Sequence, residues 1–143
     1  MPTAFVIDDN RLSADCLADC LRLLNYETRV LLGPLPAIES LGSRLPDVVF
    51  LDIHMQGMDG VEVCRYIRRD PRLAAVPIIG ISTDTQSSLV ERVRLAGANG
   101  FLSKPIDFEA LEGVLRAVEK LNAAARSQAT NGGLGLARRV AVR

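Results

Sequence analysis

Polar residues able to take part in chemistry follow short apolar runs at four points of this sequence. The clearest run is residues 48–51 (VVFL), which leads directly into Asp52. The polar residues at the four points are Asp8 and Asp9, Asp52, Ser82 and Lys104. If every apolar run is a strand of one parallel sheet, these side chains share the sheet edge where open α/β folds bind their ligands.

Three carboxylates, a hydroxyl and an ammonium group at one edge are suited to phosphoryl chemistry. Clustered carboxylates repel one another, so their charged forms need a cation between them, and oxygen ligands from few residues suit hydrated Mg²⁺. Lysine and serine supply donors for phosphoryl oxygens, and an aspartate carboxylate can accept a phosphoryl group covalently. Taken alone, Asp52 is equally well interpreted as a residue that ends a strand, because aspartate is common there. The other polar residues favour the chemical interpretation.

The apolar periodicity predicts five strands that alternate with five helices. The predicted strands cover residues 4–7, 28–32, 48–52, 77–82 and 100–103, and the predicted helices cover residues 11–25, 36–45, 59–69, 85–96 and 107–122. Asn25 and Gly97 are expected to end helices, and Asp107 is expected to cap the last one. Strands that alternate with helices indicate right-handed crossovers onto a parallel sheet.

The first predicted helix carries an apolar stripe that we expect to face the core. Its members are Leu12, Cys16, Leu17, Cys20, Leu21 and Leu24. The odd number of cysteines, with Cys64 as the third, and the single histidine favour small apolar residues in or near the core over a metal site.

The length of 143 residues suggests a single domain with one core. We predict that this domain covers residues 1–125 and that residues 126–143, which contain three glycines, four arginines and no acid, form a flexible basic tail. Residues 1–122 hold 13 basic and 17 acidic residues, a net charge of −4, which argues against direct nucleic-acid binding.

No apolar run approaches the roughly 20 residues that a membrane span requires. The N-terminal residues Met1-Pro2-Thr3-Ala4 also lack the basic and apolar regions of a signal peptide. We therefore expect a cytoplasmic protein with no membrane partner.

In this order and spacing, the polar residues resemble the receiver domain of two-component response regulators, the CheY-like family. The resemblance covers residues 4 to about 122 and rests on Asp8-Asp9, Asp52, Ser82 and Lys104-Pro105, each after its own predicted strand. It implies a flavodoxin-like α/β fold, doubly wound, with five parallel strands in the order 2-1-3-4-5.

The resemblance also implies a phosphorylation site that depends on Mg²⁺. Asp52 is the implied phosphoacceptor. Asp9 and Asp52 would bind Mg²⁺ directly and Asp8 would assist through water, with the backbone carbonyl of His54 as a further ligand. The expected cofactor is therefore Mg²⁺.

Further residues are implied to sense the phosphoryl group. Ser82 and Lys104 would bind its oxygens, and Ser82 would act as a switch together with Phe101, the aromatic residue three positions before the lysine. Phe101 is expected to swing inward on activation, although its spacing alone would also suit a core residue. The Lys104–Pro105 peptide bond is expected to be cis, a geometry open to proline at little energetic cost.

Residues that surround the site are expected to tune it. Thr83 stands where the family usually has a small residue after the switch hydroxyl, so its stiff β-branched side chain should narrow access. Asp84 adds negative charge near the entrance, and His54 is expected to be an exposed tuning residue and not a catalytic base. Gln56 replaces a frequent proline, which we expect to loosen that turn.

The predicted function is phosphoryl acceptance on Asp52 from a histidine kinase or a histidine phosphotransfer protein. Such a protein is a switch that assists its own phosphorylation and dephosphorylation, and it is not an enzyme in the usual sense. The expected output face, formed by residues 85–96, 100–103 and 107–122, binds an unknown downstream protein or forms a phosphorylation-dependent homodimer.

Two other functions are compatible with the sequence. The same fold can serve as a protein-binding module that is never phosphorylated, although the full acidic site argues against it. An aspartyl-phosphate phosphohydrolase is the second alternative, but such enzymes usually carry two aspartates spaced two residues apart after the first strand, together with a substrate cap. Here Asp8 and Asp9 are adjacent, and no insertion of cap length is present.

Overall fold

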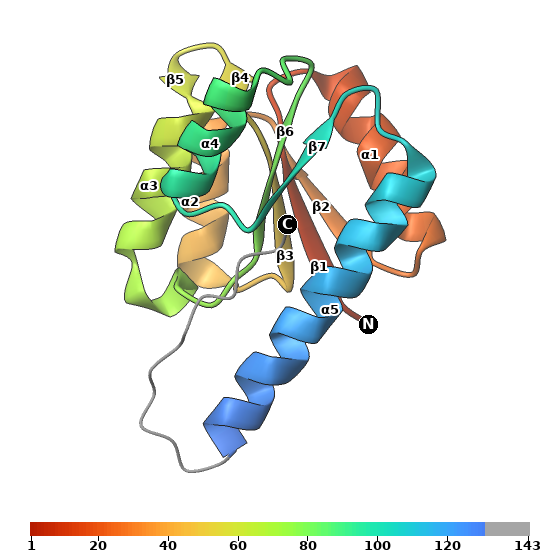
Figure 1. Cartoon of the computed structure of the whole chain (residues 1–143), viewed down its shortest axis with the longest axis vertical. Coiled ribbons are helices and arrows are strands. Elements are labelled where there is room, and N and C mark those ends of the chain that lie inside the picture. The colour runs from red at the N-terminus through yellow and green to blue at the C-terminus, as the bar shows by residue number, and fades with distance from the viewer. Residues whose placement is uncertain (131–143) are drawn as a thin grey trace.

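The computed structural model describes residues 1–130 of the chain. A five-stranded parallel sheet forms its centre, with the order β2-β1-β3-β6-β7 (Figure 1). The strands are β1 (Thr3–Ile7), β2 (Glu27–Leu31), β3 (Val48–Asp52), β6 (Ile78–Ser82) and β7 (Gly100–Ser103). Numbered among themselves, these strands have the order 2-1-3-4-5, so the predicted flavodoxin-like fold is confirmed.

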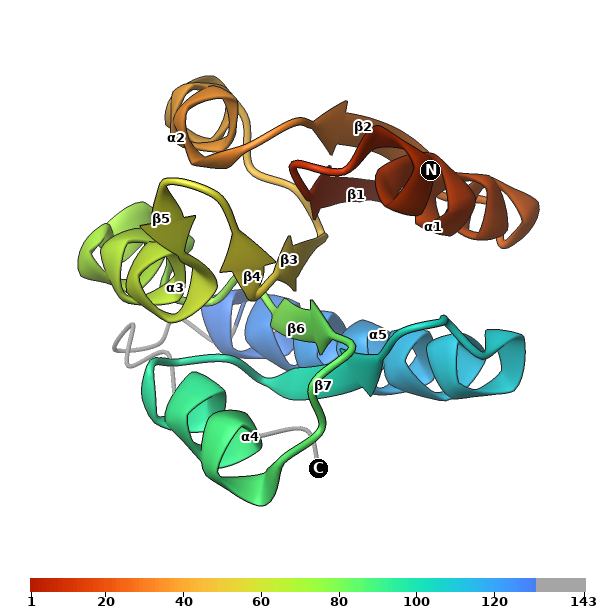
Figure 2. The same ribbon diagram turned by 90° about the horizontal axis from the view of Figure 1, so that it is seen from above.

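Helices cover both faces of this sheet (Figure 2). They are α1 (Arg11–Leu23), α2 (Pro34–Ser43), α3 (Gly60–Arg69), α4 (Ser87–Leu95) and α5 (Phe108–Thr130), with a 3-10 turn, η1 (Pro71–Leu73), after α3. Helices α1 and α5 lie on one face, and α2, α3 and α4 lie on the other. This is the doubly wound arrangement that alternating strands and helices predict.

The central strands β1, β3 and β6 are buried along their whole length, because helices cover them on both sides. Their side chains point alternately into two separate cores. Phe5 and its register partner Val49 face the core under α2, α3 and α4, whereas Val6 and its partner Phe50 face the core under α1 and α5. Continuous apolar runs, and not alternating ones, are therefore the correct signal for these strands.

Three of the predicted helix limits are confirmed. Asn25 and Gly97 follow α1 and α4 with φ angles of 67° and 117°, the left-handed conformation that ends helices. Asp107 caps α5, since its Oδ2 accepts a hydrogen bond from the Ala110 N–H at 2.9 Å.

The side of α1 that faces the core differs from the predicted stripe. The buried residues are Ala14, Leu17, Ala18 and Leu21. Leu12 is 76% exposed and Cys16 is also exposed, so the core positions predicted for these two residues are wrong. The two alanines allow the helix axis to approach the sheet closely, and this places the buried stripe on their side of the helix.

Helix α2 and the loop after Asp52 also differ from prediction. Helix α2 begins at Pro34, because proline is well suited to the first turn of a helix. The loop after Asp52 contains a small antiparallel hairpin, β4 (His54–Met55) and β5 (Met58–Asp59), which is too short for a periodicity signal.

Helix α5 is longer than expected and reaches Thr130, so residues 126–130 are helical and do not belong to a flexible tail. Alanine and arginine in this stretch are strong helix formers, and the first glycine comes only at residue 132. The rest of the predicted tail lies outside the described residues. Between residues 1 and 130, no helix is both long and apolar enough to cross a membrane.

Candidate functional site

The predicted site residues meet at the carboxyl-terminal edge of the sheet. Asp8 and Asp9 follow β1, Asp52 ends β3, and Ser82 ends β6. The strands β1, β3, β6 and β7 are neighbours in the sheet, and the Lys104 N–H after β7 donates to the Ser82 carbonyl at 2.9 Å. The sheet order therefore brings together residues that are far apart in the sequence.

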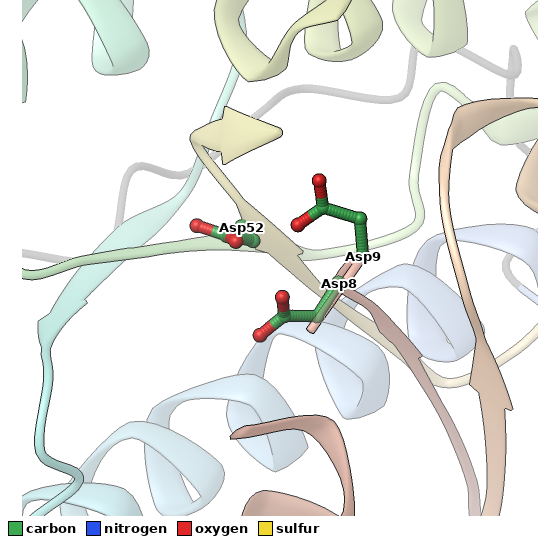
Figure 3. A group of neighbouring side chains, drawn as sticks. All are labelled: Asp8, Asp9 and Asp52. Atoms are coloured by element: carbon green, nitrogen blue, oxygen red, sulfur yellow. The ribbon is translucent and has the colours of Figure 1, made fainter. Parts of the chain in front are cut away.

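Asp8, Asp9 and Asp52 form a carboxylate cluster (Figure 3). One oxygen atom from each residue lies within 4.8 Å of the others. Asp8 is fully buried and Asp52 is 5% exposed, whereas Asp9 is exposed to solvent. Two buried acids and one exposed acid make a pocket that is open to water on one side, which suits a hard cation that keeps part of its hydration shell.

The ammonium group of Lys104 reaches into the same cluster. Its Nζ lies 2.9 Å from Asp8 Oδ2 and 3.5 Å from Asp52 Oδ2, and its side chain is 17% exposed. A single positive charge cannot balance three carboxylates, so the cluster is still suited to a divalent cation. The lysine therefore supplies one fixed donor between β1 and β3 without completing the charge balance.

The two buried carboxyl groups have pKa values that are pushed in opposite directions. Burial, together with the neighbouring Asp8 carboxyl group, raises the pKa of Asp52 to about 6, although the Lys104 ammonium and the His54 N–H act against this. Burial also acts to raise the pKa of Asp8, but hydrogen bonds from Lys104 and from the Asn10 N–H outweigh it and leave the pKa below its usual value. Of these two buried groups, Asp8 therefore ionises at lower pH than Asp52.

The β4–β5 hairpin is tied to this cluster through backbone N–H groups. The Gln56 N–H donates to Asp9 Oδ2 at 2.8 Å, and the His54 N–H donates to Asp52 Oδ1 at 3.2 Å. Sequence reasoning did not identify the Gln56 contact. Only Gly57 in the loop could have indicated the turn that makes it, since glycine readily adopts the positive φ, here 87°, that tight turns need.

The residues after β6 form a second border of the site. The buried Ser82 accepts a hydrogen bond at Oγ from the Asp84 N–H at 3.0 Å, so its own hydroxyl proton is left for another acceptor. Thr83 is exposed. His54 Nε2 lies 4.0 Å from Asp84 Oδ2, and both side chains are partly open to solvent. The side chains of Thr83, Asp84 and His54 therefore lie around the site, and His54 contacts the carboxylate cluster through its backbone N–H.

Phe101 is partly buried beside the strand that carries Ser82. A Cβ atom added to Gly80 would lie 3.3 Å from Phe101 Cδ2 and 2.9 Å from Val93 Cγ1. The glycine therefore leaves space that the ring and α4 occupy together. The Lys104–Pro105 peptide bond is cis, as predicted.

Comparison with known protein families gives a match to one family over most of the chain. The model described as "Response regulator receiver domain" matches residues 4–116. Among curated proteins, the polar-differentiation response regulator DivK of Brucella anthropi is 27% identical over 104 residues, which cover 73% of this chain and 85% of DivK. DivK of Brucella ovis matches over the same length with the same identity.

Solved structures agree with this match. A crystal structure described as a putative response regulator from Chloroflexus aurantiacus has a TM-score of 0.78 at 27% identity and covers 82% of this chain and 96% of its own. The receiver domain of a DNA-binding response regulator from Colwellia psychrerythraea has a TM-score of 0.78 at 29% identity, with 84% and 99% covered. The chemotaxis protein CheY4 of Vibrio cholerae, at 24% identity and a TM-score of 0.78, shares the fold.

Proposed function

This chain belongs to the response regulator receiver domain family, and we propose that it takes a phosphoryl group onto Asp52 from a histidine kinase or a histidine phosphotransfer protein. Receivers are typically phosphoacceptors and not classical enzymes. The observation that carries the proposal is the position of Asp52, which ends β3 beside two further carboxylates and 3.5 Å from Lys104 Nζ.

Asp52 is the proposed nucleophile. One of its carboxylate oxygens attacks phosphorus, the bond from phosphorus to the donor nitrogen breaks, and the imidazole of the donor leaves with the electron pair. The reaction needs the ionised form of Asp52, and its pKa of about 6 leaves that form dominant at neutral pH. Phosphorylation then shifts an equilibrium between two conformations.

The cluster formed by Asp8, Asp9 and Asp52 would hold Mg²⁺, with the His54 carbonyl as the further ligand. When bound, this ion supplies positive charge to the phosphoryl oxygens and offsets the repulsion within the cluster. The three carboxylates fit the ion, because they supply oxygens within 4.8 Å of one another and one side of the cluster is open to water. Asp9 and Asp52 are the ligands that connect the cluster to the β4–β5 hairpin.

Ser82 and Lys104 are the proposed partners of the phosphoryl oxygens. The Ser82 hydroxyl can donate outward, because the Asp84 N–H already occupies one of its lone pairs. Lys104 would exchange its contact with Asp52 for one with the phosphoryl group, since its Nζ already lies between β1 and β3. Phe101 is the proposed switch aromatic, because its ring packs against β6, two residues before Ser82.

The proposal includes a limited catalytic role, in which the site assists both arrival and hydrolysis of the phosphoryl group. The proposed output face is formed by α4, β7 and α5, which bind a downstream protein or a second phosphorylated copy.

We further propose that the protein works in the cytoplasm, makes no membrane contact and does not bind nucleic acid directly. The acidic balance of residues 1–122 supports the last point.

Mass spectrometry after incubation with a small phosphodonor and Mg²⁺ tests the proposal. We expect the wild-type chain to gain the mass of one phosphoryl group, and Asp52→Asn, whose amide has the same shape but is no nucleophile, to gain none. Asp9→Asn is the matched control, because it lies in the same cluster but is expected to slow the reaction without abolishing it. An adduct on Asp52→Asn at the wild-type yield would overturn the assignment, and no adduct on either chain would favour a non-phosphorylated binding module.

A further inference from the structure

An apolar groove lies between α4 and α5, with the edge strand β7 at its base. It has a volume of about 680 Å³, and its walls include Val90, Val93, Phe101, Gly113, Val114 and Ala117. Figure 2 shows α4 and α5 on opposite faces of the sheet with β7 between them, so the groove runs along the free edge of the sheet. Among residues 1–130, no segment covers this groove.

We propose that residues 131–143 of the same chain dock reversibly into this groove, which we call the α4–α5 groove. The sequence of this segment is NGGLGLARRVAVR. Leu134, Leu136, Val140 and Val142 fall on even positions, so an extended conformation would place all four side chains on one face, with Arg138 between them. Such an alternating face matches a groove that accepts apolar side chains along a line.

The segment begins where it can reach the groove. Helix α5 ends at Thr130, and the groove begins at Ala117 on the same helix, about 20 Å away at 1.5 Å per residue. Residues 131–143 span about 40 Å when extended, roughly twice the distance they must cover. Val114 and Ala117 line the groove from one side of α5. Leu121 and Ala124 follow on that side at helical spacings of four and three residues, so an apolar path leads from the helix end to the groove.

The overall charge of residues 1–130 attracts this segment, although the charged residue that lines the groove itself is Arg94, which repels it. Residues 1–130 hold 17 acidic and 14 basic residues, a net charge of −3, and residues 131–143 hold three arginines and no acid. A tethered segment also has an effective local concentration on the order of millimolar, which a separate partner seldom reaches. Weak docking of a tethered segment is therefore sufficient to cover the groove for much of the time.

Gly113 offers a direct way to fill the groove from inside. A Cβ atom at this position would meet nothing closer than Arg116 Nη2 at 3.8 Å, so a larger side chain enters open space and not the core. Leucine also favours the helix more than glycine does. Gly113→Leu should therefore keep the fold and exclude the segment. Gly42→Leu in α2 is its matched control, because an added Cβ there meets nothing within 4 Å.

Methyl NMR of the full chain, without any phosphodonor, tests the proposal independently of whether Asp52 is phosphorylated. We expect the double variant Leu136→Ser/Val140→Ser to shift the methyl signals of Val90, Val93 and Val114. Ala137→Ser/Ala141→Ser, which adds the same two hydroxyls to the opposite face of the segment, should leave them in place. Gly113→Leu should shift the Val90 and Val93 signals as the tail double variant does, and Gly42→Leu should not.

Three results would overturn the proposal. Unchanged groove signals in Leu136→Ser/Val140→Ser would mean that the segment does not occupy the groove. Equal shifts in the Ala137→Ser/Ala141→Ser control would mean that the apolar face does not matter. If dilution of the wild-type chain by about twentyfold produced the same shifts as the tail variant, the occupant would be a second copy and not the chain's own segment.

Discussion

The backbone N–H of Gln56 donates a 2.8 Å hydrogen bond to Asp9 Oδ2, and this contact joins the β4–β5 hairpin to the carboxylate cluster. A proline at this position, which the family often has, would carry no N–H and could not make the bond. The loss of proline is still expected to loosen this turn, and the Gln56 N–H acts in the opposite direction because it connects the turn to the cluster. Asp9 is the exposed member of the cluster, so this bond also limits the orientation of its side chain.

We predict that Gln56→Pro lowers the affinity for Mg²⁺ several-fold. A charge-assisted hydrogen bond that orients a ligand contributes on the order of 1 kcal/mol. Gln56→Ala keeps the N–H and is the matched control, for which we expect wild-type affinity. Isothermal titration with Mg²⁺ measures both variants, and equal affinities for Gln56→Pro and wild type would show that the hydrogen bond does not position Asp9.

The raised pKa of Asp52 predicts that the Mg²⁺-free protein loses stability as pH increases from about 4 to about 6. The folded-state pKa of about 6 lies above the unfolded value of 3.8, so the folded state holds this proton more tightly and its stabilising effect disappears when the proton leaves. The lowered pKa of Asp8 acts in the opposite direction at lower pH.

Asp52→Asn removes the ionisation and should raise the free energy of unfolding at pH 7 by on the order of 2 kcal/mol, with a much smaller gain at pH 4. Urea unfolding at the two pH values in the presence of a chelator measures the difference. Addition of Mg²⁺ should reduce the gain, because the ion relieves the same repulsion in the wild-type protein. A gain of equal size at both pH values would contradict the assigned pKa.

The sequence was sufficient to predict the sheet and the residues at its edge, because the strands that carry the site are short apolar runs that stop at a polar residue, whereas β2 (ETRVL) is not. Asp52 after residues 48–51 is the clearest case. The side of α1 was mistaken because Leu12 is more hydrophobic than Ala14, whereas burial in a close helix–sheet contact favours the smaller side chain. The Gln56 contact with Asp9 uses a backbone N–H, a group that every residue except proline has, so residue type alone could not reveal it.

Lys104→Ala is predicted to separate phosphorylation from the response to it. Asp52 remains a nucleophile without the lysine, but the phosphoryl group loses the contact that connects β3 to β7. We expect an adduct yield close to that of the wild type and a much smaller change in hydrogen exchange across residues 82–104. Lys120→Ala, on α5 and exposed, is the control. A wild-type exchange response in Lys104→Ala would exclude the lysine as the reporting group.

Tyr26 gives a prediction at alkaline pH that is independent of the site. The Tyr26 ring is buried, and its hydroxyl donates to Glu119 Oε1 at 3.4 Å. Burial together with the Glu119 charge raises the pKa of Tyr26 to about 12. In the unfolded chain Tyr26 ionises near pH 10. Its stabilising effect on the folded state is therefore complete below pH 10 and is lost as pH increases towards 12. Tyr26→Phe should reduce this loss, measured by urea unfolding, and the half-exposed Tyr66→Phe is the control. Equal pH slopes in Tyr26→Phe and wild type would refute the pKa.

The last prediction concerns Thr83, whose exposed side chain directly follows the buried Ser82 at the edge of the site. A branched side chain there should hinder both the incoming donor and the water that hydrolyses the phosphoryl group. We expect Thr83→Ala to speed phosphorylation and dephosphorylation by about tenfold, which corresponds to about 1.4 kcal/mol of activation free energy. Thr83→Val keeps the branched shape without the hydroxyl, so it should retain the slow rates if bulk is the cause. Stopped-flow phosphorylation and decay of the labelled protein measure both steps. Fast rates in Thr83→Val would assign the effect to the hydroxyl. Wild-type rates in Thr83→Ala would show that the bulk of residue 83 controls neither step.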